Sequence, residues 1–573
     1  MRGMWRLALA GSAVVCAAQN SGTGQAGEAP PTLHVEAQTV VLDVVVESRN
    51  GEPVKGLRAD DFQVAENGTP QKIVYFEEHG PTAAPAHPYP PLPPDVFTNV
   101  PRGQRGDSMN VILIDTMNSS RQTQVWEQQQ LRAFFETAKP DVPMAIFSLT
   151  SHLHLIHDFT TDSAALLQAL SDKKAAIWPD TTALARETQD DVQDLEDIQT
   201  LEMMLSGTMA SSNDIPMMQR AQAEHRGMQE NAQRAATLEA LEALARYLAR
   251  QAGRKNVFWF ADRFPMAFTA DANAGNSTPG GIADTPIREA TNLLAEARIA
   301  VYPIAATGVD TDGMTSASVW SLSTAQSASG LHAQARVDST LGMNRIAEQT
   351  GGQAIQNHNF LTQALDEAIG VGEHYYTLSY IPTDTVRDGK MRRIAVKTTD
   401  GKDRLSYRRG YYANDTSAQP MAPLRNLLMK SVPDAMELVF VTRVSPDPQT
   451  PPANPRLKGP LRRYRVDVLI PAAEAPLALD GDRHRGQLEV DVVAWGKDGR
   501  AVGWTGGPVE VNLDAATYAT EQKVGLPMHL AIDVPENADS LKVGVYDAGR
   551  AGTMLVELNE VHALAEGTAP QKP

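Results

Sequence analysis

An aspartate that follows an apolar run is the side chain in this sequence best placed for chemistry. Residues 111–114 are all aliphatic and lead directly to Asp115, and hydroxyl side chains follow at Thr116 and Ser119. Such a run is typical of a buried parallel strand, which delivers its last residue to the rim of an α/β sheet. Carboxylate and hydroxyl oxygens are ligands of hard cations. Asp115 is therefore either a metal ligand or the polar end of a strand, and its neighbours leave both interpretations open.

The histidines between residues 152 and 157 form the other candidate site. Alternation along a strand would place His152 and His154 on one face, as two ligands of a zinc ion. No third ligand has an identifiable position, so an exposed strand face is the favoured interpretation. The sequence also has no G-x-S-x-G motif, no H-E-x-x-H motif and a single cysteine, Cys16. These observations argue against a secreted hydrolase and favour a protein without enzymatic activity.

Length and composition limit the class of protein. A chain of 573 residues is too long for a single hydrophobic core, and its length predicts about three or four domains. Its 42% apolar and 21% charged residues are typical of a folded protein. A formal net charge of −18 argues against binding to nucleic acid or to an anionic membrane, because both require clustered lysine and arginine.

The N-terminal residues 1–18 have the pattern of a signal peptide. Arg2 and Arg6 supply a positive segment before the short apolar core at residues 7–18. Val15 stands where a lipoprotein signal needs a small residue, which argues against lipidation of Cys16. No later apolar run approaches the roughly 20 residues that cross a bilayer, so no transmembrane segment is predicted. We therefore expect a secreted or periplasmic protein after cleavage.

Alternating strands and a proline-rich segment follow. Residues 33–78 have the alternation of half-buried strands, with Asn-Gly turns at 50–51 and 67–68. Eight prolines lie between residues 81 and 106, which predicts a stiff, extended linker that forms neither helix nor sheet. Residues 374–415 return to strands, and we expect them to pair with those of residues 33–78. Residues 421–565 predict a C-terminal β-sandwich, in which the only helix is a short one near residues 423–432.

Between these strands, residues 107–373 alternate strands with helices. This rhythm predicts a mostly parallel sheet with helices on both faces, and it places Asp115 at the carboxyl edge of that sheet. The predicted strands are 111–114, 144–149, 153–156, 256–261 and 299–304, and the helices include 121–139, 162–170 and 285–297. Asp162 is expected to cap the second of these helices. A further long helix is expected to end in an apolar stripe at helical spacing, formed by Leu238, Leu241, Leu244 and Leu248. Arg254 and Lys255 are expected at a helix C-terminus, where cations meet the dipole. Two insertions are expected to be an acidic amphipathic helix at 187–206 and a surface loop at 306–340.

Five short segments, in this order and spacing, resemble the VWFA-related domain family of secreted (acidobacterial-type) proteins. They lie at residues 54–64, 252–265, 350–352, 375–380 and 407–412. The resemblance implies a Rossmann-like von Willebrand factor type A domain over residues 107–373, combined with all-β sandwich modules. It also implies an exported protein whose function is generally unassigned in the family.

Type A domains hold a Mg²⁺ or Mn²⁺ ion on three loops at the carboxyl edge of the sheet, and the resemblance implies such a site here. The usual first loop is Asp-x-Ser-x-Ser, but Met117 replaces its first hydroxyl, and a thioether is a poor ligand for a hard cation. The ligands implied are Asp115, Ser119, Thr181 or Thr182, and Asp262. The alternative is a structural polar rim without a metal.

Binding or adhesion is the function that this resemblance favours. The partner would be a protein, and one of its acidic side chains would complete the metal site. The alternatives are a metal-independent structural subunit of an envelope assembly and, less favoured, a secreted hydrolase.

Overall fold

The structure, a computed structural model, describes residues 39–558 apart from internal gaps. The gaps are 81–92, 94, 99–107, 138–141, 151–152, 172–213, 250, 252, 263, 265–284, 306–338, 357–360, 414–423, 429–438, 452–459, 472–476, 497–499, 536–537 and 548–551. The predictions for the signal peptide, for Thr181 and Thr182, for the helix at 187–206 and for most of the loop at 306–340 therefore lie outside the described residues. In the described part of the chain, no helix is long and apolar enough to cross a membrane.

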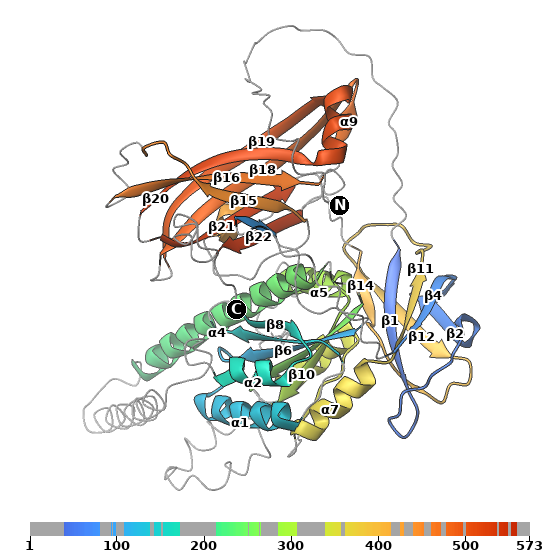
Figure 1. Ribbon diagram of the computed structural model, residues 1–573. Helices are drawn as coiled ribbons and strands as arrows, with labels where there is room; N and C mark the ends of the chain where they lie inside the picture. Colours follow the sequence, from blue (N-terminus) through green and yellow to red (C-terminus); the bar gives the residue numbers. More distant parts are fainter. Residues whose placement is uncertain are drawn as a thin grey trace, which may run out of the picture. The chain divides into compact units, whose positions relative to one another are not determined.

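An α/β unit, residues 108–373, is built on a five-stranded sheet with the order β10-β9-β6-β7-β8 (Figure 1). Its strands are β6 (Ser108–Asp115), β7 (Met144–Leu149), β8 (Leu153–Thr160), β9 (Arg254–Ala261) and β10 (Ile299–Ala305). Strands β7, β6, β9 and β10 pair in parallel, and β8 is antiparallel at one edge. The other four sheets of the described chain are antiparallel, so the parallel arrangement belongs to this unit.

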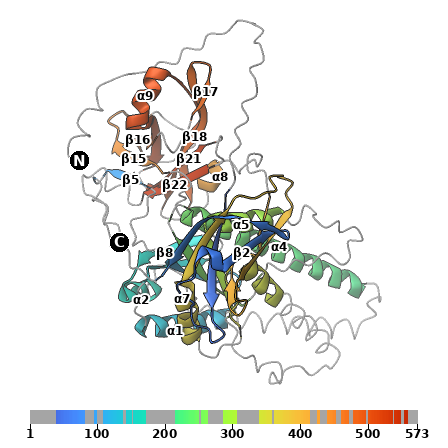
Figure 2. The same cartoon turned by 90° about the vertical axis from the view of Figure 1, so that its right-hand side faces the viewer.

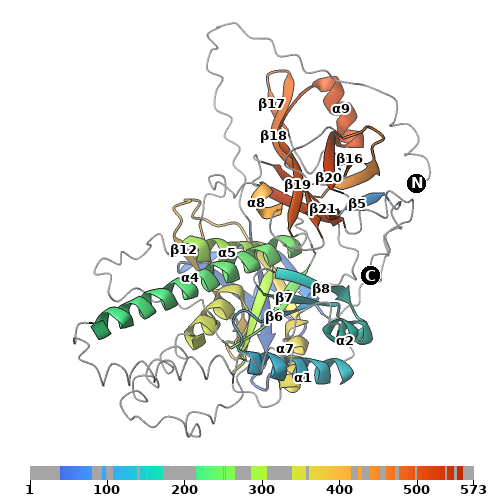
Figure 3. The same ribbon diagram turned by 90° about the vertical axis from the view of Figure 1, so that its left-hand side faces the viewer.

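Helices cover both faces of this sheet (Figures 1 and 3). One face carries α4 (Asp214–Leu248) and α5 (Thr285–Glu296), and the other carries α1 (Arg121–Thr137), α2 (Ser163–Ser171) and α7 (Leu361–Gly372). Because side chains alternate along a strand, Val111 and Leu113 of β6 pack with α4 and α5, whereas Ile112 and Ile114 pack with α1, α2 and α7. All residues of β6 are buried, which explains the continuous apolar run before Asp115.

Local signals for two helices are confirmed. The Asp162 carboxylate caps α2, because it accepts hydrogen bonds from the backbone N–H groups of Ala164 (2.9 Å) and Ala165 (3.3 Å). The apolar stripe near the end of α4 is buried in the core of the α/β unit; it consists of Leu238, Leu241, Leu244 and Leu248. Helical spacing of these leucines thus identified the face that packs on the sheet.

Strands from both sides of the α/β unit form a β-sandwich, which we call the host sandwich (residues 39–80 and 374–413). Its two sheets have the orders β13-β1-β11-β4 and β14-β12-β2-β3. The strands are β1 (Val40–Glu47), β2 (Phe62–Glu66), β3 (Thr69–Gln71), β4 (Ile73–His79), β11 (Tyr375–Tyr380), β12 (Met391–Thr398), β13 (Arg404–Ser406) and β14 (Gly410–Tyr412), with a short 3-10 helix η1 (Ala59–Asp61). β1 pairs with β11, and β2 pairs with β12. The two segments therefore share ladders, and the α/β unit is inserted between them in the sequence.

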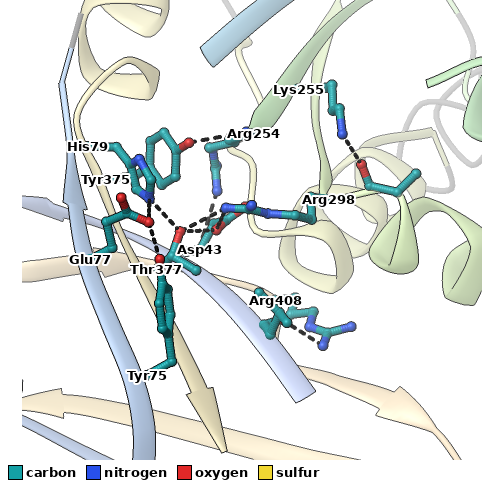
Figure 4. A network of polar contacts seen from close by, with 12 residues as sticks. Asp43, Tyr75, Glu77, His79, Arg254, Lys255, Arg298, Tyr375, Thr377 and Arg408 are labelled. Carbon is teal, nitrogen blue, oxygen red and sulfur yellow. Dashed lines mark hydrogen bonds and ion pairs between the residues drawn. The ribbon is translucent and has the colours of Figure 1, made fainter. Parts of the chain in front are cut away.

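The prediction that Arg254 and Lys255 end a helix is wrong. Gly253, with φ of 78°, allows the chain to turn sharply after α4, and both basic residues begin β9. Arg254 and Lys255 are 2% and 1% exposed. They lie at the amino edge of the sheet, where the α/β unit meets the host sandwich (Figure 4). Hydrogen bonds to carbonyl and side-chain oxygens of both units compensate for their burial, which a local helix-dipole argument did not anticipate.

The C-terminal part of the chain forms two further antiparallel sheets, of orders β20-β16-β15-β5 and β17-β18-β21-β22, with β19 paired to β18. Their strands are β5 (Val96–Thr98), β15 (Val441–Pro446), β16 (Leu461–Ile470), β17 (Ala478–Asp480), β18 (Arg483–Gly496), β19 (Ala501–Asp514), β20 (Leu526–Pro535), β21 (Ala538–Asp547) and β22 (Gly552–Leu558). The inner faces of the two sheets share one core, as in a sandwich.

Two predictions for this region need correction. The proline-rich linker does contribute a strand, since the proline-free triplet Val96–Thr98 forms β5 and pairs with β15. A helix that was not predicted, α9 (Ala515–Val524), lies beside β18 and β19 (Figures 1 and 2). It begins at Asp514, whose carboxylate accepts a hydrogen bond from the Thr517 N–H at 2.8 Å. The predicted short helix is present as α8 (Leu424–Leu428).

Candidate functional site

The carboxyl edge of the α/β sheet brings together three of the predicted site residues. Asp115 ends β6, and Asp262 directly follows β9, the neighbouring parallel strand. The loop after Asp115 contains Ser119, and the next backbone N–H, that of Ser120, donates to the Asp262 carboxylate (Oδ2) at 2.7 Å. Parallel pairing of β6 and β9 therefore places the two aspartates at one rim.

Asp115 is a buried carboxylate that accepts hydrogen bonds from Asn118 and Trp259. Its Oδ1 accepts from the backbone N–H of Asn118 at 3.0 Å, and its Oδ2 accepts from the Asn118 amide at 2.7 Å and from the Trp259 indole at 2.9 Å. Burial raises the pKa of Asp115 to about 6, although the hydrogen bonds from Asn118 and Trp259 oppose this rise. Both oxygens are thus engaged by N–H donors inside the protein.

The remainder of the loop is also held by internal contacts. The Thr116 hydroxyl donates to the backbone carbonyl of Leu149 at 3.1 Å, and Met117 packs against the core shared with α4 and α5. The Gln124 side chain of α1 donates to the backbone carbonyls of Thr116 and Ser119, both at 2.9 Å. The apolar Met117 therefore has a packing role at the position where the family pattern has a hydroxyl.

Glu127 of α1 is a residue of this rim that the sequence analysis missed. It is 0% exposed, and its Oε1 accepts a 3.3 Å hydrogen bond from the Ser119 hydroxyl. Burial is the main cause that raises the pKa of Glu127 well above its ordinary value, and the nearby charges of Asp262 and Asp115 raise it further. The signal was available, because Glu127 shares the buried face of α1 with Leu131, four residues later.

Two oxygens at the rim are buried and have no hydrogen-bond partner in the described structure. They are Oε2 of Glu127 and Oδ1 of Asp262. The side-chain N–H₂ group of Asn118 also donates to the Thr237 hydroxyl of α4, at 2.9 Å. Among the three carboxylates, the oxygens without a partner thus lie on Glu127 and Asp262, and not on Asp115.

These contacts do not fit the ligand set that the family resemblance implies. A cation at Asp115 would face the N–H donors of Asn118 and Trp259, and Met117 supplies no oxygen. Within the described ranges, no group of three or more His, Cys, Asp or Glu residues is arranged to hold a metal ion. Thr181 and Thr182 lie outside those ranges.

The histidine segment takes the form of a strand with partly exposed side chains. His154 lies in β8, and its Nε2 is 3.1 Å from the Thr150 hydroxyl. His157 Nδ1 is 2.6 Å from the backbone carbonyl of Asp158. His152 lies outside the described residues.

Comparisons with known proteins give distant structural similarities. No family model matches the sequence, and no curated protein is significantly similar to it. A von Willebrand factor type A protein from Catenulispora acidiphila is 10% identical, with 88% of this chain and 74% of that chain covered and a TM-score of 0.23. An aerotolerance-related membrane protein from Bacteroides fragilis is 11% identical, with coverages of 46% and 98% and a TM-score of 0.22. The three N-terminal domains of the type V pili tip protein Mfa5 from Porphyromonas gingivalis are 8% identical, with coverages of 88% and 78% and a TM-score of 0.23.

Proposed function

We propose that this protein is an exported, non-enzymatic scaffold or binding protein, in which a type A domain is carried by the host sandwich. The observation that supports this proposal most directly is the bonding of the rim. Asp115 accepts hydrogen bonds from Asn118 and Trp259, and Asp262 accepts one from Ser120. Polar groups that hydrogen-bond to one another stabilise the conformation of the rim, whereas a catalytic site leaves such groups free to contact its substrate.

Recognition of a partner protein then depends on the shape of this hydrogen-bonded rim and not on an open coordination position at Asp115. A partner carboxylate that completed a metal site would need a cation whose ligands include Asp115. The N–H donors of Asn118 and Trp259 around that carboxylate favour an anion without a metal. The proposal therefore favours metal-independent binding over cation-dependent adhesion.

Partner capture from envelope and secreted fractions of the source organism, before and after chelation, tests this function. The immobilised full chain should retain the same specific partner in EDTA, at a temperature well below its unfolding. Circular dichroism of the chelated protein provides the control for an intact fold. Loss of the partner on chelation, with the fold intact and recovery upon addition of Mg²⁺, would return the protein to the cation-dependent adhesion class. Turnover of ester, peptide or glycoside substrates would exclude a non-enzymatic role.

A further inference from the structure

The edge strands of the described sheets are protected in different ways. In the host sandwich, β3, β13 and β14 are edge strands of three residues each. In the C-terminal part of the chain, β19 lies beside β20, and β22 lies beside β5. In the α/β unit, helices α2 and α4 lie beside β8, and Ile304 of β10 forms a bridge with Ile355. Short length and cover by a neighbouring element both prevent an edge from pairing with another chain.

Strand β4 of the host sandwich has neither form of protection. It is seven residues long, and within the described residues it pairs with β11 alone (Figure 1). Because hydrogen bonds alternate along an antiparallel strand, about half of its backbone N–H and C=O groups point away from β11. The side of β4 opposite β11 is therefore an open edge, on which a further strand can form a ladder.

Two large apolar side chains are exposed on this edge. The register between β4 and β11 shifts between Ser379 and Tyr380, so Val74 has no residue opposite it. Such a bulge changes the direction of side chains at an edge. Val74 is 54% exposed and the adjacent Tyr75 is 50% exposed. Together they offer apolar area to the side chains of an added strand.

The acidic end of β4 determines which kind of strand fits. Glu78 is used within the host sandwich, where its Oε1 accepts hydrogen bonds from the Gly56 N–H at 2.8 Å and from the Tyr376 hydroxyl at 3.2 Å. The side chain of Glu77 is 50% exposed, and one of its oxygens accepts a hydrogen bond from the Tyr75 hydroxyl (Figure 4). A strand added to this edge places a side chain next to Glu77, where a basic residue is favourable and an acidic residue is unfavourable.

The same charges disfavour a second copy of this chain as the added strand. Antiparallel pairing of two β4 strands about Phe76, the central residue, would place the Glu77 residues of the two copies diagonally across the ladder. Each copy also carries a formal net charge of −18, so the two chains repel one another as they approach. A basic segment of another protein meets neither obstacle.

We propose that the open edge of β4 binds an extended segment of a partner protein by strand addition, and that apolar residues alternate with lysine or arginine in this segment. Main-chain hydrogen bonds supply the affinity, Val74 and Tyr75 contact the apolar side chains, and Glu77 pairs with a basic one. This edge belongs to the host sandwich and not to the rim at Asp115. The inference thus adds a second surface to the proposed function and does not depend on what the rim recognises.

Binding of a probe peptide to the full chain tests the assignment. The probe is a short, fluorescently labelled peptide of alternating valine and lysine, and its binding is measured by fluorescence anisotropy. The wild type should bind it saturably, and hydrogen exchange should show new protection of β4 amides. N-methylation of two adjacent central residues removes donors along both edges of the peptide and should abolish binding. Replacing its lysines with glutamate should weaken binding at least about tenfold.

Variants of the full chain locate the binding surface. Glu77→Lys should lower the affinity for the lysine peptide about tenfold, and Val74→Lys should lower it as well, because each places a cation next to the added strand. If Glu77→Lys does not fold, Glu77→Gln takes its place, with an expected decrease of about threefold. The matched control is Val386→Lys, which should bind as the wild type does. Val386 is 61% exposed, but it lies in the loop between β11 and β12 and not on an edge strand.

Three results with the probe would overturn the proposal: no saturable binding by the wild type, equal binding of the N-methylated peptide, or equal effects of Val74→Lys and Val386→Lys. Analytical ultracentrifugation supplies a further test. Concentration-dependent dimerisation of the wild type that Val74→Lys abolishes would also overturn the proposal, because a second copy would then occupy the edge. These outcomes leave the proposed function at the rim unaffected, since that function is tested by the response of partner capture to chelation.

Discussion

The ion pair between Arg298 and Asp43 offers a quantitative test of how the α/β unit is held on the host sandwich. Arg298 lies between α5 and β10 with φ of 57°, a left-handed conformation that is uncommon for residues other than glycine. Its guanidinium donates to both carboxylate oxygens of Asp43 in β1 and to the Thr377 hydroxyl of β11 (Figure 4). A strained residue thus makes the bidentate contact between the two units.

The pKa values of this pair agree with a strong contact. Burial would raise the pKa of Asp43, but the Arg298 guanidinium, with smaller contributions from Arg254 and Thr377, outweighs burial and lowers it. For Arg298, burial acts to lower the pKa and the Asp43 carboxylate raises it, with a net increase. Both partners are therefore stabilised in their charged forms.

The magnitude follows from removing one partner at a time. Truncating one member of a buried pair destabilises a protein by about 3–5 kcal/mol. The Arg298 side chain is 26% exposed and that of Asp43 is 7% exposed, so the lower end, about 3 kcal/mol, is expected for Arg298→Ala. Arg298→Gly loses the same ion pair and relieves a left-handed strain of about 1–2 kcal/mol. Part of that relief is offset by the greater entropy of unfolded glycine, about 0.5–1 kcal/mol.

We therefore expect Arg298→Gly to be more stable than Arg298→Ala by about 0.5–1 kcal/mol, and both to be less stable than the wild type. Differential scanning calorimetry of the full chain would give this order, with hydrogen exchange of β1 and β11 amides as the local measurement. Combining Arg298→Ala with Asp43→Asn should be much less destabilising than the sum of the two single changes. An Arg298→Ala variant within about 0.5 kcal/mol of the wild type, or additive single changes, would refute the reasoning.

Three further predictions concern buried side chains and a close backbone contact. Trp259→Phe removes the indole donor to the Asp115 carboxylate and should lower the free energy of unfolding by about 1–3 kcal/mol, measured by urea denaturation. Burial lowers the pKa of Lys255 to about 7 from 10.5. Between about pH 7 and 10.5 the unfolded state therefore binds more protons than the folded state, so the free energy of unfolding of the wild type should rise with pH in this range. Lys255→Met should be more stable than the wild type at and below pH 7, and this advantage should shrink toward pH 10.5; a constant difference would contradict the burial argument. At Gly352 an added Cβ would lie 1.9 Å from the Val301 carbonyl oxygen, so Gly352→Ala should lower the free energy of unfolding by more than about 3 kcal/mol. Gly370 lies in α7 with open space around it, so Gly370→Ala should raise the free energy of unfolding by about 1 kcal/mol. Differential scanning calorimetry of the full chain would measure both.

The sequence predicted the elements of the α/β unit because their signals are local. The run at residues 111–114 is apolar since β6 is covered on both faces, and the carboxylate of Asp162 caps α2 through its own neighbours. The rim position of Asp115 followed from these elements. The bonding of its carboxylate did not follow, because the indole of Trp259 comes from a strand that lies 144 residues later in the chain.

Contacts at long sequence separation also explain the wrong predictions. Arg254 was assigned to a helix end because its partners, the carbonyls of Asp43 and Gly351, are 211 and 97 residues away. The strand at Val96–Thr98 was hidden within a proline-rich segment, and it becomes a strand only through pairing with β15. Glu127 shows the opposite case, since its four-residue spacing from the buried Leu131 is a local signal of burial, and this signal was missed.

The segments that carry the family resemblance meet where the α/β unit joins the host sandwich. Arg254 donates to the carbonyl of Gly351 at 2.8 Å, and its backbone N–H donates to the Tyr375 hydroxyl at 3.2 Å. The Tyr376 hydroxyl donates to the carbonyl of Val54 at 2.9 Å. Glycine is required at 351, because an added Cβ would lie 2.7 Å from the backbone nitrogen of Arg408.

Three of the five segments, and the first residues of a fourth, therefore lie where the inserted unit contacts its host, whereas the segment at residues 54–64 packs within the host sandwich. The rim at Asp115 and Met117 lies at the opposite end of β6 from this junction, since Ser108 pairs with Arg254 and Ile114 pairs with Phe260. Changes of side chain at the rim leave these junction contacts intact. Residues at the junction consequently concern the architecture and not the chemistry at the rim, which has to be established from Asp115, Glu127 and Asp262 themselves.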